Sequence, residues 1–199
     1  PSSIVPRIKY GEGVIADQCD NVTVLFADIV GFTNLSNTLP VQHLVDLINR
    51  IFLKFDQLAE THKVEKIKTI GDAYMAAAGV PEPCNDHADR ALALGRDMQR
   101  AVERFAIRRS NGEDIHIQIR VGIATGTAMA GVLGALKYTY DVWGHAVNEA
   151  SRVESHGVPK GVLISESARN KLTQQWDFKD EFEIDLKGMG RKKVFLYCA

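Results

Sequence analysis

The segment VTVLFAD, residues 22–28, is apolar on both of the faces that alternate along a strand. A strand with one solvated face alternates apolar and polar residues, whereas a continuous apolar run is typical of a central strand covered on both sides. The rest of the chain must therefore supply covering layers for a sheet. Asp28 ends the run, and the IVGFT that follows is predicted to be a loop in which Gly31 is the flexible position.

Two predicted helices can form a covering layer. Apolar residues at helical spacing predict one helix from about Val41 to His62. Asp86 can cap a second helix that runs to about Arg108. Both helices carry one apolar stripe, so each is expected to pack on a sheet rather than to stand alone.

A hairpin and a further strand complete the predicted core. Residues 64–69 and 73–79 are strand-like runs joined by Gly71-Asp72, a dipeptide typical of tight hairpins. Residues 115–126 alternate as IxIxIxVxI and predict another strand. The order β-α-ββ-α-β predicts an α+β sandwich of the ferredoxin-like, split βαβ type. A helix at HAVNEASRVES, a strand at VLIS, a helix capped by Ser165 and a last strand at KKVFLYCA predict a C-terminal α/β extension.

Composition restricts the class of protein less sharply. The 199 residues suit one domain, and the formal net charge of −1 gives no general attraction to nucleic acid. Three widely spaced cysteines without a CxxC pair argue against a disulfide framework and fit a reducing, cytoplasmic compartment. No apolar run approaches the ~20 residues that span a bilayer. We expect residues 1–20 to be a lead-in from an upstream linker, followed by a single domain at 21–199.

Two aspartates are predicted at neighbouring strand ends. Asp28 closes the first strand and Asp72 lies at the hairpin tip, points that can lie side by side in a ferredoxin-like sheet. Two adjacent carboxylates repel each other unless a cation lies between them, and Mg²⁺ prefers oxygen ligands and bridges to phosphates. Two such ions ~3.5–4 Å apart would clamp both oxygens of a phosphoryl displacement. Taken alone, each aspartate is more commonly a cap or a turn residue.

The IVGFT loop after Asp28 adds a second, weaker signal. Its backbone N–H groups could cradle phosphate oxygens, which makes Phe32 and Thr33 candidate substrate-binding residues. The loop matches neither the Walker A pattern nor the Rossmann glycine pattern.

Lys68 and Asp141 form a possible base-reading pair. A lysine can donate to the N1 acceptor of adenine while an aspartate accepts from the exocyclic amine. Guanine presents the reverse pattern, and unpaired buried polar groups make such discrimination large. The alternative is an ordinary surface ion pair, which contributes little.

Asn148 and Arg152 lie four residues apart on a predicted helix and therefore share a face. The amide could hold a ribose oxygen, and the guanidinium suits the charge that develops on a phosphoryl group. The alternative is a solvated helix face, on which both residue types are common.

Together, FADIVGFT, EKIKTIGDAYM and YDVWGHAVNEASRVE resemble the catalytic domain of class III nucleotidyl cyclases, in the order and internal spacing of that family. The resemblance runs from about Val22 to the C-terminus. It implies the family's ferredoxin-like core, which is similar to a polymerase palm. It also implies cyclisation of a nucleoside triphosphate by attack of the ribose 3′-hydroxyl on the α-phosphate, with pyrophosphate leaving.

The resemblance also implies roles for residues. Two divalent cations, Mg²⁺ or Mn²⁺, are implied at Asp28 and Asp72, with the backbone carbonyl of Ile29 as a further ligand. Asn148 matches the ribose-orienting asparagine, and Arg152 matches the arginine that stabilises the transition state.

Lys68 and Asp141 match the purine-reading pair in its adenylyl form, since guanylyl members typically place Glu and Cys there. The expected substrate is therefore ATP and the expected product cyclic AMP. The alternatives are a guanylyl cyclase or relaxed purine choice and, less expected, a nucleotide-binding pseudo-cyclase that dimerises without turnover. Diguanylate cyclases and polymerase palms share the metal chemistry, but neither a GG[DE]EF-like motif nor a basic nucleic-acid track is present.

The resemblance implies a partner as well. Family sites lie between two catalytic domains, and this chain carries both sets of residues, so a head-to-tail homodimer with two sites is expected. An upstream regulatory or membrane domain is expected before the lead-in, with a role in signal transduction. One departure is Met189, which stands in LKGMGRKK where the family often has a phosphate-binding lysine. Lys187, Arg191 and Lys192 are the candidates to replace it.

Overall fold

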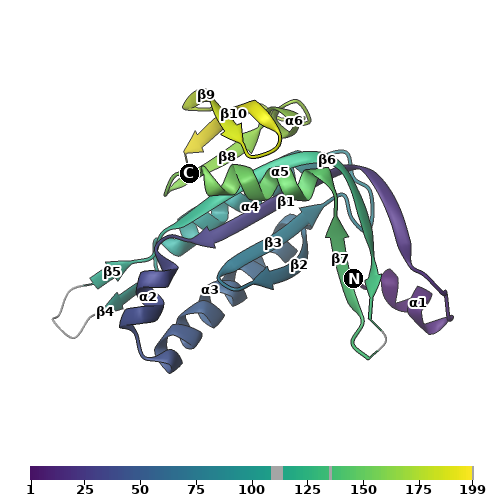
Figure 1. The fold of residues 1–199 in the computed structure, drawn as a ribbon, viewed down its shortest axis with the longest axis horizontal. Helices are drawn as coiled ribbons and strands as arrows, with labels where there is room; N and C mark the ends of the chain where they lie inside the picture. Colours follow the sequence, from purple (N-terminus) through teal and green to yellow (C-terminus); the bar gives the residue numbers. More distant parts are fainter. Residues whose placement is uncertain (109–113, 135, 199) are drawn as a thin grey trace.

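The computed structural model describes residues 1–108, 114–134 and 136–198, and its main feature is one large twisted sheet (Figure 1). The sheet contains β1 (Ala16–Ile29), β2 (Glu65–Ile70), β3 (Ala73–Ala78), β6 (Ile119–Leu133), β7 (Thr139–Trp143), β8 (Gly161–Ser165), β9 (Asp180–Leu186) and β10 (Gly190–Cys198). A separate ribbon pairs β4 (Ala106–Arg108) with β5 (Asp114–His116). The helices are α1 (Ile4–Lys9), α2 (Phe32–Thr38), α3 (Val41–His62), α4 (His87–Val102), α5 (His145–Ser155) and α6 (Glu166–Arg169).

The strand order confirms the ferredoxin-like core. The strands run β2-β3-β1-β6-β8-β10-β9, and β7 also pairs with β6. The strands β2, β3, β1 and β6 belong to the unit β1-α3-β2-β3-α4-β6. In this unit, β1 lies antiparallel to both β3 and β6. The predicted C-terminal extension is also present, because β8 joins β6 in parallel and β10 and β9 follow in antiparallel pairs.

Helices cover opposite faces of the sheet (Figure 1). On one face, Leu25 and Ala27 of β1 belong to the cluster that contains the buried stripes of α3 and α4. On the other face, Val24 and Phe26 pack in a second cluster with the small residues of α5. This alternation confirms that β1 is a central strand, and it places the side chain of Asp28 on the α5 face.

Several predicted boundaries were wrong. The IVGFT segment is not all loop, because α2 begins at Phe32 after Gly31, which adopts a left-handed conformation with φ of 70°. The second long helix ends at Val102 rather than near Arg108, because residues 106–108 extend to pair with β5. Tertiary strand pairing overrides the local helical pattern there.

The strand pattern also differs from the prediction. The alternating run 115–126 is interrupted after His116, where Ile117 donates its N–H to Phe105, and β6 then continues unbroken to Leu133. The strand β9 was not predicted, because its exposed face and charged residues hide the alternation.

At the N-terminus, β1 begins at Ala16, so it crosses the boundary expected at residue 20. None of the described helices combines the length and apolar character needed to span a bilayer.

Candidate active site

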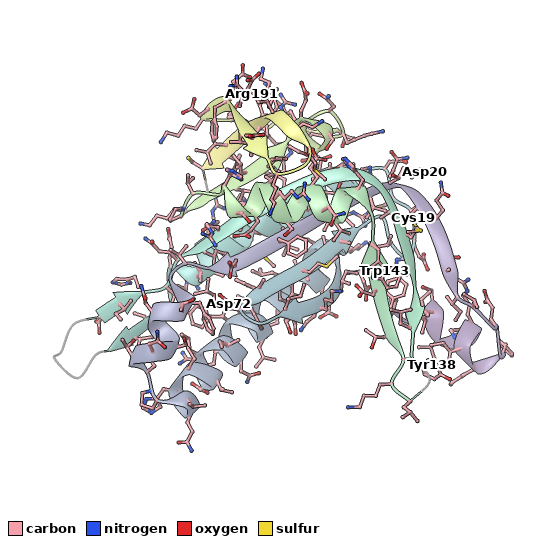
Figure 2. The ribbon with its side chains drawn as sticks, in the orientation of Figure 1. Cys19, Asp20, Asp72, Tyr138, Trp143 and Arg191 are labelled. Atoms are coloured by element: carbon pink, nitrogen blue, oxygen red, sulfur yellow. The ribbon has the colours of Figure 1, made fainter. Side chains whose placement is uncertain are left out.

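Asp28 and Asp72 meet at one end of the sheet, on the α5 face. In register, Asp28 of β1 lies opposite Ala73 of β3 on one side and Arg120 of β6 on the other. Asp72 immediately precedes Ala73, and its carboxyl group lies beside that of Asp28, near the end of the sheet that α2 borders (Figure 2). Burial, and then this contact between two carboxyl groups, raise the pKa of Asp72 to about 6.

Arg120 and Glu154 complete this carboxylate cluster, and sequence reasoning missed both. Arg120 Nη2 donates to Asp28 Oδ2 at 2.9 Å, and Arg120 Nε donates to Glu154 Oε1 at 2.9 Å. The neighbouring carboxylates raise the pKa of Arg120, although burial opposes this, and burial raises the pKa of Glu154. The alternation along residues 115–126 places Arg120 on the face of the strand opposite to Ile119 and Val121. Only the strand register shows that Arg120 lies next to Asp28.

Lys68 and Asp141 also contact each other. Lys68 Nζ lies 2.6 Å from Asp141 Oδ2, and the backbone N–H of Val142 donates to Asp141 Oδ1 at 2.8 Å. The side chain of Asp141 is 10% exposed and that of Lys68 is 34% exposed. The carboxylate is therefore fixed by two donors, while the lysine remains open to solvent and to a ligand.

Asn148 and Arg152 lie on α5, whose residues 145–155 match the predicted helix. Asn148 is exposed, and Arg152 is half-buried and donates from Nη1 to the backbone carbonyl of Lys187. The contact brings the turn between β9 and β10 against α5. Met189 in this turn packs against the apolar cluster around Val153, which gives a physical reason for an apolar residue at that position.

The predicted site residues therefore form separate groups in a single chain. Among the described residues, no hydrogen bond or ion pair joins the carboxylate cluster to Lys68 and Asp141, or either of them to Asn148 and Arg152. Phe32 and Thr33 begin α2, next to the end of β1, with Phe32 half-buried and Thr33 exposed. Ile29 is buried on the face opposite Asp28.

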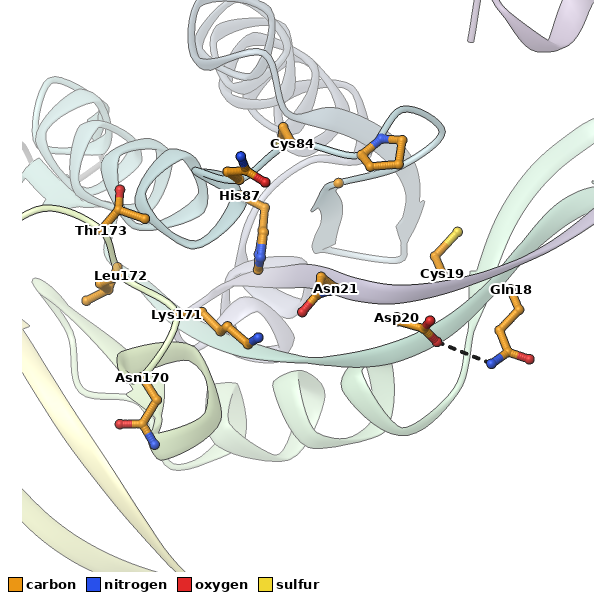
Figure 3. A pocket seen from close by; sticks show the side chains of 13 residues that line it. Gln18, Cys19, Asp20, Asn21, Cys84, His87, Asn170, Lys171, Leu172 and Thr173 are labelled. Carbon is orange, nitrogen blue, oxygen red and sulfur yellow. Dashed lines mark hydrogen bonds between the residues drawn. The ribbon is translucent and has the colours of Figure 1, made fainter.

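A cavity of about 620 Å³ lies elsewhere, near the other end of the apolar part of β1 (Figure 3). Its walls include Cys19, Cys84, His87 and Lys171. His87 is buried, and its Nδ1 lies 2.6 Å from Thr23 Oγ1. Asp86 occupies the predicted cap position of α4, but its carboxylate bonds Arg90 instead of the helix N-terminus. None of the predicted site residues lines the 620 Å³ cavity.

Comparison with known proteins identifies the family. The sequence model described as "Adenylate and Guanylate cyclase catalytic domain" matches residues 14–198. An adenylate cyclase of Mycobacterium tuberculosis is 38% identical over 191 residues, which are 96% of this chain and 42% of that protein. The rat guanylate cyclase soluble subunit beta-2 is also 38% identical, over 98% of this chain and 28% of that protein. The chain thus spans less than half the length of these relatives.

A solved structure agrees in fold. The catalytic core of a rhodopsin-guanylyl cyclase with converted specificity, in complex with ATPαS, superposes with a TM-score of 0.83 at 34% identity. The match covers 92% of this chain and 98% of that one. The chain therefore belongs to the adenylate and guanylate cyclase catalytic domain family of class III nucleotide cyclases.

Proposed function

We propose that this domain is an adenylyl cyclase, which converts ATP to 3′,5′-cyclic AMP and pyrophosphate. The observation that carries the choice of ATP is the 2.6 Å contact between Lys68 Nζ and Asp141 Oδ2. A donor and an acceptor held side by side match N1 and the exocyclic amine of adenine, and they would leave guanine with mismatched groups. The relatives themselves include adenylyl and guanylyl cyclases, so the family alone does not choose the purine.

The carboxylate cluster fits divalent cations. Asp28 Oδ1 is buried and has no hydrogen-bond partner among the described residues, and Asp72 lies beside it. The cluster of Asp28, Asp72, Glu154 and Arg120 has excess negative charge when all its carboxylates are ionised. No group of three or more His, Cys, Asp or Glu side chains is arranged around a metal position in the described chain. The ligands would therefore be Asp28, Asp72 and the backbone carbonyl of Ile29, completed by phosphate oxygens and water.

Bound Mg²⁺ or Mn²⁺ would stabilise the negative charge that develops on the attacking and leaving oxygens. In the reaction, a bond forms between the 3′-oxygen and the α-phosphorus, and the bond from that phosphorus to the oxygen that bridges the α- and β-phosphates breaks, so that this oxygen leaves with pyrophosphate. We assign the 3′-hydroxyl proton to Asp28, the carboxylate with the unpartnered oxygen. Phe32 and Thr33, which follow it in sequence, are assigned to the triphosphate.

The residues on α5 orient the substrate and stabilise the transition state. Asn148 would hold the ribose, and Arg152 would contact the α-phosphate as negative charge develops there. In the free chain Arg152 donates to the carbonyl of Lys187, so substrate must compete with a backbone acceptor for the guanidinium. The carbonyl of Lys187 therefore lies beside the guanidinium that would contact the α-phosphate.

The division of these residues into separate groups supports a head-to-tail homodimer. One chain would supply Asp28 and Asp72, and its partner would supply Lys68, Asp141 and the α5 residues. Two equivalent sites follow from closed two-fold symmetry. The same chain with relaxed purine choice, or one that prefers GTP, is the second candidate, and it differs only at the base-reading pair.

One experiment tests substrate, metal and dimer together. Turnover of ATP and of GTP is measured with Mg²⁺ and with Mn²⁺ across a range of protein concentrations. We expect cyclic AMP to dominate and specific activity to rise with concentration until the dimer is saturated. Equal or greater output of cyclic GMP would refute the assignment of ATP, and constant specific activity down to concentrations where the protein is monomeric would refute the shared site.

The role of Arg152 has its own test. Arg152→Ala is expected to lower kcat by about 100- to 1,000-fold with little change in KM, because the interaction forms mainly in the transition state. Arg100→Ala is the matched control, since Arg100 is an exposed helix arginine on α4 whose nearest carboxylate, on Asp97, is 3.9 Å away. It should leave kcat unchanged.

A further inference from the structure

Glu154 is a buried acidic residue that the proposed reaction does not use. It is 8% exposed, and its Oε1 accepts from Arg120 Nε at 2.9 Å. Burying a carboxylate is costly even when it is paired, and a well-packed apolar residue is often as stable at such a position. The packing of α5 therefore does not by itself require a charge at this position.

Arg120 is shared between two carboxylates. Nε donates to Glu154 while Nη2 donates to Asp28 Oδ2. A guanidinium is planar and presents its donors in a fixed fork, so fixing Nε also fixes the direction of Nη2. The consequence is visible on Asp28, where Oδ2 is bonded and the buried Oδ1 has no partner among the described residues. Without Glu154, the same fork could turn to donate to both oxygens of Asp28, and such a bidentate pair is the stronger geometry.

The main chain holds Glu154 in place. A Cβ added at Gly122, two residues after Arg120 on β6, would lie 2.1 Å from the backbone nitrogen of Glu154. This contact is possible only because residue 122 is glycine, and it clamps the end of α5 onto β6. The Glu154 carboxylate is therefore presented to Arg120 by the backbone rather than by a flexible surface side chain.

We propose that Glu154 is a positioning residue for the cation site, which holds Arg120 by Nε so that the guanidinium makes one bond to Asp28 and leaves the other carboxylate oxygens free. This inference rests on the proposed role of Asp28 and Asp72 as cation ligands. Arg152, two residues earlier on α5, faces away from Glu154 because residues i and i+2 of a helix point in different directions. The same helix thus serves the cation site of its own chain through Glu154 and, in the proposed dimer, the other site through Arg152.

The test measures Mn²⁺ binding to the nucleotide-free protein, by the loss of the free-ion electron paramagnetic resonance signal. Glu154→Gln should weaken Mn²⁺ binding, because Arg120 then binds the aspartates instead of sharing its charge. The expected loss in Mn²⁺ affinity is about two- to 100-fold, which is the usual range of coupling between contacting residues. Glu149→Gln is the matched control, because Glu149 is also buried on α5 but accepts from Ser167 and not from Arg120. It should bind Mn²⁺ as the unsubstituted protein does.

A double-mutant cycle separates positioning from a general effect of charge. In an Arg120→Gln background, Glu154→Gln should have no further effect on Mn²⁺ binding. If the two substitutions instead act additively, Glu154 acts by distant charge and the proposal is wrong. Glu154→Asp gives a second route should the glutamine variant not fold. It keeps the charge but shortens the reach to Arg120, and unchanged Mn²⁺ affinity there would also overturn the proposal.

One further variant distinguishes failure of this inference from failure of the proposed function. Asp28→Asn should abolish most Mn²⁺ binding. If it does so while Glu154→Gln has no effect, the cation site stands and Glu154 is only structural. If Asp28→Asn leaves Mn²⁺ binding intact, the assignment of Asp28 as a ligand is wrong, and the role of Glu154 falls with it.

Discussion

Lys68 Nζ and Asp141 Oδ2 lie 2.6 Å apart in the free chain, although β2 and β7 are not paired in the sheet. The two groups that we assign to purine recognition therefore satisfy each other before substrate arrives. A base that enters this position must replace part of that contact with bonds of its own. A base with the wrong order of donor and acceptor would break the contact between Lys68 and Asp141 without forming bonds in return. The pair would therefore discriminate between the two purines.

Exchanging this pair should exchange the purine. Lys68→Glu together with Asp141→Cys is expected to change the ratio of kcat/KM for ATP over GTP by about 100-fold or more in favour of GTP, because the hydrogen-bonding order is reversed. Cyclic AMP and cyclic GMP formation from each substrate alone gives the ratio. Lys66→Glu is the control, since Lys66 of β2 donates to Asp56 of α3. An unaltered ratio in the double variant would show that other groups read the base.

Two inactive chains should complement each other. In the proposed homodimer, Lys68→Ala should remove base recognition and Asp72→Ala should remove a cation ligand. In a head-to-tail heterodimer, one site would then carry both changes while the other would carry neither. Mixing equal amounts should restore activity to about one quarter of the unsubstituted level, if chains pair at random and each intact site works independently. Tandem purification with two tags confirms the heterodimer. Absence of activity in a purified heterodimer would contradict a site shared between chains.

Replacing Gly122 should destabilise the protein, whereas replacing Gly126 should not. An added Cβ at Gly122 meets the backbone of Glu154 at 2.1 Å, whereas at Gly126 it meets the Ala146 side chain at an ordinary 3.6 Å. Gly122→Ala is expected to lower the free energy of unfolding by about 1–3 kcal/mol or more and to reduce turnover, because α5 is pushed away from β6. Gly126→Ala, on the same strand and under the same helix, should change stability little. Urea denaturation and cyclic AMP assays measure both effects, and equal stability of the two variants would contradict the close contact.

The stability of the metal-free protein should depend on Asp72 between about pH 4 and pH 6. The pKa of Asp72 is raised to about 6 from 3.8, so the folded chain retains a proton that the unfolded chain has already released. This contribution is fully present below the unfolded value and is lost as pH rises through the folded value. Because Asp72 is partly exposed, we expect at most about 1 kcal/mol, or about 2–4 °C in Tm.

Asp72→Asn should remove that part of the pH dependence. The comparison is made by thermal unfolding in the presence of a chelator at pH 4, 5, 6 and 7. Other groups also titrate in this range, so the informative quantity is the difference in Tm between the two proteins at each pH. A difference that stays constant from pH 4 to pH 7 would mean that Asp72 is not perturbed in the folded chain.

Local patterns in the sequence determined much of this protein. The continuous apolar run at 22–28 fixed a central strand, the helical stripe fixed α3 at Val41–His62, and Gly71-Asp72 fixed the hairpin, because each depends on neighbours within a few residues. The three motifs placed the chain in its family and named Asp28 and Asp72 as adjacent carboxylates.

Tertiary structure alone decided how these pieces meet. Arg120 lies 92 residues from Asp28 and 34 from Glu154, so their contact depends on the register of β1 with β6 and on the approach of α5 at Gly122. The same holds for the end of α4, where pairing between β4 and β5 overrides the local helical pattern. Periodicity reports which face a side chain occupies, but contacts between distant strands are selected by packing of the whole core, and the charge cluster around Asp28 is a product of that packing.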